Sequence, residues 1–219
     1  IYYSILPTVT QFARNSLFAG LLPSEIEKKY PQYWINENEK GNKNDFEHAL
    51  LDEYLSRFGI NIKHSYSKIL NADFAKKINN NLHQSIHTPL NVVIYNFVDM
   101  LSHAHTDVDI VRELANDEAS YRSVTLSWFE HSPLLEMLKF LAEKKAKVFI
   151  TTDHGAIRIF NPIKVVGDKE TSTSLRYKVG KSLDFSSKEI FAISNPQEIY
   201  LPKLNVSSKY IFATGNNFF

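Results

Sequence analysis

The sequence predicts an α/β fold in which a mostly parallel sheet carries helices on both faces. Short apolar runs rich in β-branched residues recur along the chain, and amphipathic helical stretches lie between them. Gly or Pro marks the point where several of these elements end. With 219 residues, the chain is long enough for one α/β domain with a sizeable core. It shows no internal repeat and no linker of the kind that separates domains.

The elements expected in the first part of the chain are a strand at Ile1–Leu6, a helix at Gln11–Ala19, a solvated loop at 36–44, and helices at Asp45–Phe58 and Asp73–Leu82. Pro7 closes the strand, and Gly20 ends the first helix. The helix at Asp45–Phe58 has an apolar stripe at positions 46, 49, 50 and 55, and Gly59 ends it.

The elements expected in the second part are a strand at Leu90–Tyr95, a long helix from Thr106 or Asp107 towards Trp128, a helix from Ser132 to near Lys145, a strand at 146–152, a loop rich in Lys, Ser and Thr at 164–188, and strands at Ile190–Ile193 and Lys209–Ala213. Ser132 followed by Pro133 is a typical helix start.

The composition excludes several classes of function. The sequence contains no cysteine, which excludes disulfides, thiolate catalysis and Cys-ligated metal sites. The formal net charge is +1, so bulk electrostatic binding of a nucleic acid is not expected. No apolar run reaches about 18 residues, so the sequence predicts no membrane span.

A hydroxyl-bearing turn follows the first expected strand, in the sequence Pro7-Thr-Val-Thr-Gln11. A helix that opens at Thr10 would place backbone N–H groups and the positive end of its dipole beside the hydroxyl. This environment favours a bound phosphate and stabilises an alkoxide. Arg14 lies one helical turn further on, from where its guanidinium donors would reach the same anion. The alternative is that Thr8 or Thr10 only caps the helix.

A carboxylate and two imidazoles follow the strand at Leu90–Tyr95. Asp99 and His103 are four residues apart, so one helical turn would bring them together as zinc ligands. His105 is less well placed, and we expect it to lie at the surface or behind the ligands.

A second Asp–His pair, Asp153-His154, follows the expected strand at 146–152. The carboxyl ends of strands carry the chemistry in open α/β sheets. A capping Asp and a core His are the alternative interpretation of this pair. Together, two Asp–His pairs and a hydroxyl turn approach the residue set of a two-zinc phosphoryl-transfer site.

The order of these motifs, Pro-Thr-x-Thr, Asp-x-x-x-His and Asp-His-Gly, resembles that of the alkaline phosphatase superfamily. Within it, the stretches 4–15, 149–155 and 175–180 resemble the PglZ domain, most closely the PglZ output domain of PorX-type response regulators. Those are two-component proteins with an N-terminal receiver domain, linked to type IX secretion. The resemblance covers nearly the whole chain.

The resemblance implies a role for each motif. Thr10 would be the nucleophile and a ligand of one zinc ion, whose shell Asp153 and His154 would complete. Asp99 and His103 would hold a second zinc ion. The cations Arg14, Arg176 and Lys178 would meet substrate phosphates. The alternative for Arg176 and Lys178 is that they are simple solvated charges.

Two features of the superfamily are missing from the sequence, namely an earlier metal-binding Asp and a late His in a His-Gly-Gly segment. We therefore expect residues 1–219 to be one alkaline-phosphatase-like domain, incomplete at both ends, with cap segments at about 20–90 and 155–200. Such a fragment would bind zinc less tightly and could be inactive alone.

The sequence thus predicts a cytoplasmic, zinc-dependent phosphodiesterase or phosphatase that acts on a phosphodiester or nucleotide. A receiver domain would precede it in the full-length protein, and a homodimer is left open. The alternative from another class is a catalytically silent signalling or interaction domain that binds zinc or a nucleotide. A sulfatase or phosphomutase relative is disfavoured, because sulfatases generally use a modified Cys or Ser where this chain has Thr10.

Overall fold

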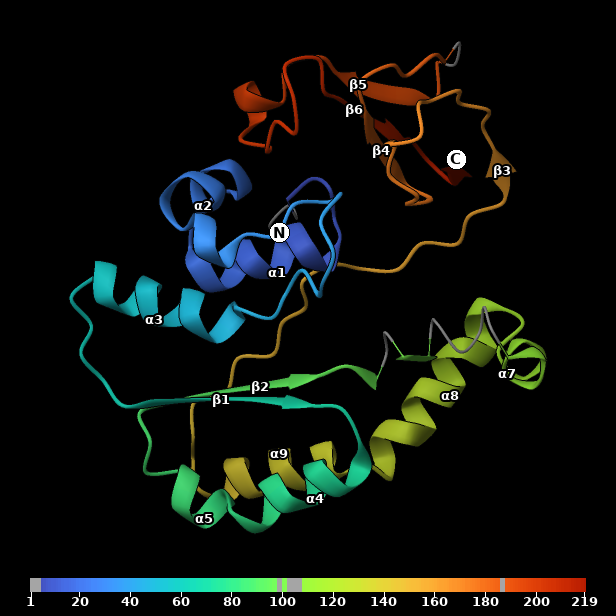
Figure 1. The fold of residues 1–219 in the computed structure, drawn as a ribbon. Helices are drawn as coiled ribbons and strands as arrows, with labels where there is room; N and C mark the ends of the chain where they lie inside the picture. Colours follow the sequence, from blue (N-terminus) through green and yellow to red (C-terminus); the bar gives the residue numbers. More distant parts are fainter. Residues whose placement is uncertain (1–4, 98–99, 102–107, 186–187) are drawn as a thin grey trace. The chain divides into compact units, whose positions relative to one another are not determined.

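The computed structural model describes residues 5–97, 100–101, 108–185 and 188–219, and these divide into two compact units (Figure 1). The first unit is discontinuous and consists of residues 1–60 and 151–219, whereas the second unit is residues 61–150. The predicted zinc ligands Asp99 and His103, together with His105, lie outside the described residues, as does most of the expected first strand.

The N-terminal part of the first unit is helical, with α1 (Thr10–Ala19), α2 (Pro23–Lys29), the 3-10 helix η1 (Pro31–Tyr33) and α3 (Glu47–Arg57). The predictions for α1 and α3 are confirmed. As expected, α1 ends at Gly20, which adopts a left-handed conformation with φ +58°. A Cβ atom there would lie 2.3 Å from the Tyr54 ring of α3, so glycine also allows the close approach of the two helices.

The core of this unit lies where α1 meets α3 and the C-terminal strands. Phe12, which is 1% exposed, packs edge-to-face against Trp34 and Tyr177, with ring centroids 5.8 and 6.1 Å apart. The Tyr177 hydroxyl donates to the Glu37 carboxylate at 2.9 Å, and burial, reinforced by that carboxylate, raises the pKa of Tyr177. These contacts join α1 to the C-terminal sheet within one unit.

The C-terminal part of the first unit contains β3 (Asn161–Pro162), β4 (Tyr177–Gly180), β5 (Ile190–Ile193), the 3-10 helix η2 (Pro196–Ile199), β6 (Lys209–Ala213) and β7 (Asn217–Phe218). An antiparallel sheet has the order β4–β6–β5, and β3 pairs with β7 in parallel. The predictions of β5 and β6 are confirmed. The prediction of a loop throughout 164–188 is wrong at β4, because Tyr177 and Val179 are buried and pair with β6.

The second unit has a two-stranded parallel sheet and several helices. They are β1 (His64–Ile69), α4 (Ala72–Asn80), α5 (Leu82–Ser85), β2 (Leu90–Tyr95), α7 (Asp109–Leu114), α8 (Glu118–Glu130) and α9 (Pro133–Glu143). Strand β2 has the predicted bounds, and it pairs with β1, which the sequence analysis did not assign. Helix α4 packs on α9, where the Asn79 side chain donates to the Pro133 carbonyl at 2.7 Å.

Two helix predictions in the second unit are only partly right. The predicted helix at Asp73–Leu82 corresponds to α4 and α5, which are separated at Asn81. The predicted long helix ending at Trp128 is divided into α7 and α8, because the Asp117 side chain caps α8 by accepting from the Ser120 N–H at 2.7 Å. Its expected cap, Thr106 or Asp107, lies outside the described residues.

The predicted strand at 146–152 is wrong. These residues have no regular secondary structure, and Phe149 and Ile150 are 80% and 81% exposed. A strand needs a neighbour to take its backbone hydrogen bonds, and we find no such partner among the described residues. The described part of the chain accordingly shows three small sheets, two of them parallel, instead of one larger parallel sheet covered on both faces.

None of the helices formed by the described residues is both long and apolar enough to cross a membrane.

Candidate active site

The start of α1 presents the Thr10 hydroxyl. The residue before the helix is Val9, whose extended backbone accepts hydrogen bonds from the N–H groups of Phe12 and Ala13. Val9 thus occupies the N-cap position, and its apolar side chain makes no capping hydrogen bond. Thr10 is the first helical residue and not the N-cap. The Thr10 hydroxyl therefore lies at the positive end of a ten-residue helix without serving as its cap.

The imidazole of His154 lies against this hydroxyl. His154 Nε2 is 3.2 Å from Thr10 Oγ1, although the two residues are 144 positions apart. The other ring nitrogen, Nδ1, lies 3.0 Å from the carbonyl oxygen of Gly155. Because a carbonyl only accepts, Nδ1 carries the hydrogen in a neutral ring, and Nε2 accepts from the Thr10 hydroxyl. This tautomer leaves a lone pair on Nε2, the form in which histidine also binds metal ions.

A carboxylate completes the cluster. Asp153 Oδ2 is 3.7 Å from His154 Nε2, and the Asp153 side chain is 18% exposed. The Thr152 hydroxyl donates to the carbonyl oxygen of His154 at 2.8 Å and so fixes the local backbone. Hydroxyl oxygen, carboxylate oxygen and imidazole nitrogen thus come together at one place.

These three side chains fit part of a zinc shell. Carboxylate oxygen and imidazole nitrogen are ordinary zinc ligands. The described residues contain no cluster of three or more His, Cys, Asp or Glu side chains that could hold a metal ion. Asp153 and His154 could therefore hold a zinc ion only with ligands beyond this pair.

Arg14 is paired with a carboxylate in the structure. Its Nε and Nη2 donate to the two carboxylate oxygens of Glu47 at 2.6 and 2.8 Å. Glu47 is fully buried at the start of α3, and Arg14 is only 9% exposed. Glu47 thus balances the guanidinium charge within the core, and the predicted contact of Arg14 with a substrate phosphate stays a prediction.

Buried amides support the same helix end. Asn44 Nδ2 donates to the carbonyl oxygen of Thr10 at 3.0 Å and to Asn15 Oδ1 at 3.1 Å. Asn15 Nδ2 in turn donates to the carbonyl oxygen of Lys43 at 3.0 Å. The sequence analysis missed Asn44 and Glu47. Asn44 ends the loop at 36–44, which was expected to be solvated throughout, yet it is buried; Glu47 is a charged residue at the start of an expected helix, and no local pattern marks it as buried.

The two other predicted phosphate ligands lie on or beside β4. Arg176 Nη1 donates to the carbonyl oxygen of Asn217. Lys178 is half-buried, and burial lowers its pKa. Lys178 lines a second pocket with Lys164 and Ser172, and this pocket shares no lining residue with the one beside His154.

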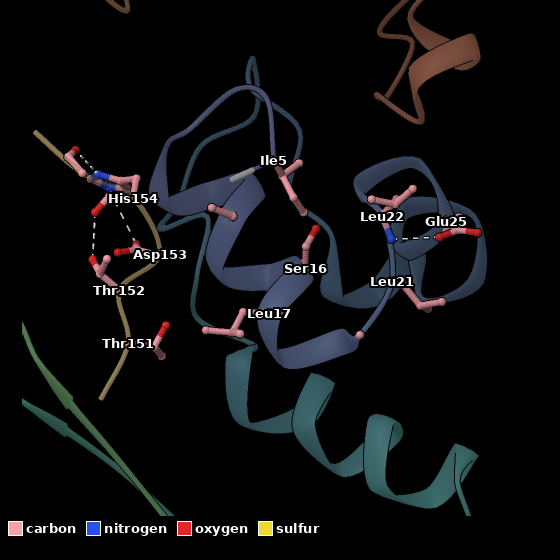
Figure 2. Close-up of a pocket in the computed structure, with 13 residues that line it drawn as sticks. Ile5, Ser16, Leu17, Leu21, Leu22, Glu25, Thr151, Thr152, Asp153 and His154 are labelled. Carbon is pink, nitrogen blue, oxygen red and sulfur yellow. Dashed lines mark hydrogen bonds and ion pairs between the residues drawn. The ribbon is translucent and has the colours of Figure 1, made fainter. Parts of the chain in front are cut away.

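A pocket of about 610 Å³ opens beside His154 (Figure 2). One side is the 151–155 segment, and the rest is formed by Ile5, α1, the turn into α2 and Glu25 of α2. Thr10 does not line this ligand-sized pocket itself, but His154 both lines the pocket and contacts the Thr10 hydroxyl.

No curated protein matches the chain. The sequence model of one family, described as the BREX system PglZ alkaline phosphatase-like domain, matches residues 1–219. A match over the whole length, together with a helix-start threonine beside an Asp-His-Gly motif, places this chain in the PglZ family of alkaline phosphatase-like domains.

Proposed function

We propose that this domain hydrolyses phosphoric esters with Thr10 as the nucleophile. The observation that carries the proposal is the 3.2 Å contact between Thr10 Oγ1 and His154 Nε2 at the start of α1. Membership of the PglZ family supports the reaction class, because that domain is alkaline phosphatase-like.

The positive end of α1 favours a phosphate group next to Thr10. The Thr10 oxygen attacks phosphorus in line with the departing alcohol oxygen, the bond from phosphorus to that oxygen breaks, and the threonine proton ends on the alcohol. Water then cleaves the phosphothreonine ester and restores the hydroxyl.

Thr10, Asp153 and His154 would hold a zinc ion in this scheme. When bound, the metal would stabilise the deprotonated hydroxyl and offset the charge of the phosphate. Asp99 and His103 are our proposed ligands for a second zinc ion. Arg176 and Lys178 are proposed as phosphate contacts on the basis of the sequence resemblance, and Arg14 on the basis of both the resemblance and its place one turn after Thr10.

The wider context is proposed from the same resemblance. We propose one catalytic domain over residues 1–219, with cap segments near 20–90 and 155–200 that select a phosphodiester or nucleotide. An N-terminal receiver domain, as in PorX-type regulators, and a cytoplasmic location belong to this proposal, and homodimerisation stays open.

A silent domain that binds a ligand without turnover is the second candidate. The pairing of Arg14 with Glu47 favours it, because that cation is neutralised within the core. Metal binding without turnover of several phosphoesters would support this second function.

Threonine substitution tests the proposal in the full-length protein supplied with zinc. We expect Thr10→Ala to lower the hydrolysis of bis(p-nitrophenyl) phosphate at least about a thousandfold, because the attacking oxygen is lost. Thr10→Ser keeps the oxygen and should retain part of the rate. Thr125→Ala is a matched control in α8, where the hydroxyl donates only locally, to the Tyr121 carbonyl oxygen. Hydrolysis by Thr10→Ala at the wild-type rate would refute the mechanism.

A further inference from the structure

The pocket beside His154 extends along one face of α1. Ala13, Ser16 and Leu17 line it at helical spacing, and Leu21 and Leu22 line its far end. Figure 2 shows the 151–155 segment on one side of Leu17 and the turn into α2 on the other. Thr10 does not line the pocket itself, so a group bonded to a phosphorus atom at Thr10 would reach this apolar wall by way of His154, which contacts Thr10 and lines the pocket.

The charge of the pocket indicates which groups fit. None of the described residues that line it is Lys or Arg. At the far end lies the carboxylate of Glu25, which accepts from the Leu22 N–H at 2.8 Å. A second phosphate in the pocket would lack a cation and face a carboxylate, whereas an uncharged group meets neither penalty.

The size and the walls favour a ring. The volume of about 610 Å³ lies within the range of small-molecule sites. The Leu17 side chain is 53% exposed, so contact with an apolar ring would remove apolar surface from water. A methyl group, or the group of another short alcohol, would leave most of this apolar surface exposed to water.

We propose that this pocket is the subsite for an uncharged, ring-bearing alcohol group of the phosphoester, which makes aryl esters better substrates than polyphosphates. The inference rests on the proposed function, since that function places the phosphate at Thr10. It adds the chemical class of the substituent, which the Thr10–His154 contact leaves open.

Binding of non-hydrolysable phosphonates tests the subsite without turnover. By calorimetry on the zinc-supplied protein, we expect phenylphosphonate to bind at least about tenfold more tightly than methylphosphonate. Pyrophosphate should gain nothing over phosphate. Leu17→Gln should reduce the phenyl preference to about threefold or less, because the ring loses its apolar contact.

The chain offers a matched control in Leu126 of α8, which is 56% exposed and also helical. Leu126→Gln should keep the full preference. Equal binding of both phosphonates by the wild type, or an unchanged preference in Leu17→Gln, would overturn the subsite.

The two proposals fail in different ways. Ring preference in binding with no turnover would overturn the nucleophile role of Thr10 and keep the subsite. Turnover that depends on Thr10, without ring preference, would keep the hydrolase and overturn the subsite.

Discussion

The two halves of the candidate site are held in different ways. Thr10 opens a helix that a buried ion pair and two buried amides fix to α3 and its preceding loop. His154 belongs to a segment without regular secondary structure, preceded by the highly exposed Phe149 and Ile150. The Thr10 side is therefore organised by its own core, and the position of the Asp–His side would respond more to whatever binds there.

Removing the buried charge partner of Arg14 should have the largest effect. We expect Glu47→Gln to lower the free energy of unfolding by about 3–5 kcal/mol, because it leaves a buried guanidinium without its counter-charge. Urea denaturation measures this. In the control Glu118→Gln, the exposed pair with Arg122 is broken, and the change should stay within about 0.5 kcal/mol. If Glu47→Gln lowered the free energy of unfolding as little as Glu118→Gln, the buried ion pair would not hold the Thr10 side of the site, and the contrast between the two halves would fail.

Loss of the amide at the start of α1 should have a medium effect. We expect Asn44→Ala to cost about 1–3 kcal/mol, because Thr10 and Asn15 lose a donor inside the unit. Hydrolysis should also slow as the helix start loosens. The control is Asn81→Ala, where an exposed amide donates to the Lys77 carbonyl oxygen. A loss of stability in Asn81→Ala equal to that in Asn44→Ala would contradict the assignment.

The exposed segment should give the smallest effect. Phe149 is 80% exposed, so Phe149→Ser should change the free energy of unfolding by no more than about 0.5 kcal/mol. Phe12→Ala, at a position that is 1% exposed, should cost about 3–5 kcal/mol. A loss above about 2 kcal/mol in Phe149→Ser would show that this ring is covered in the folded protein, and the contrast between the two halves would then disappear.

Local signals explain which elements the sequence could predict. Helix α1 carries its own stop at Gly20, and the β-branched run of β2 gave its bounds correctly. Strand β4 was missed because its identity depends on pairing with β6, some thirty residues later, and Arg176 and Lys178 look like solvated charges. The apolar run at 146–152 predicted a strand, but an apolar run does not supply the neighbouring strand that it needs.

The candidate site was predictable by residue type more than by geometry. The sequence suggested Thr10 and His154 through their motifs, and the structure brings them to 3.2 Å. It suggested Arg14 as a phosphate ligand because α1 places it one turn from Thr10. No local pattern reveals that Glu47, thirty-three positions later, accepts hydrogen bonds from the Arg14 Nε and Nη2 groups.

The discontinuity of the first unit has a consequence for biosynthesis. Residues 61–150 separate its two parts, so a ribosome finishes the whole second unit before it makes His154. At about 5–20 residues per second, this interval lasts on the order of 5–20 s. During that time Thr10 and its helix wait without their partner, and any catalytic competence arises only after His154 has been made.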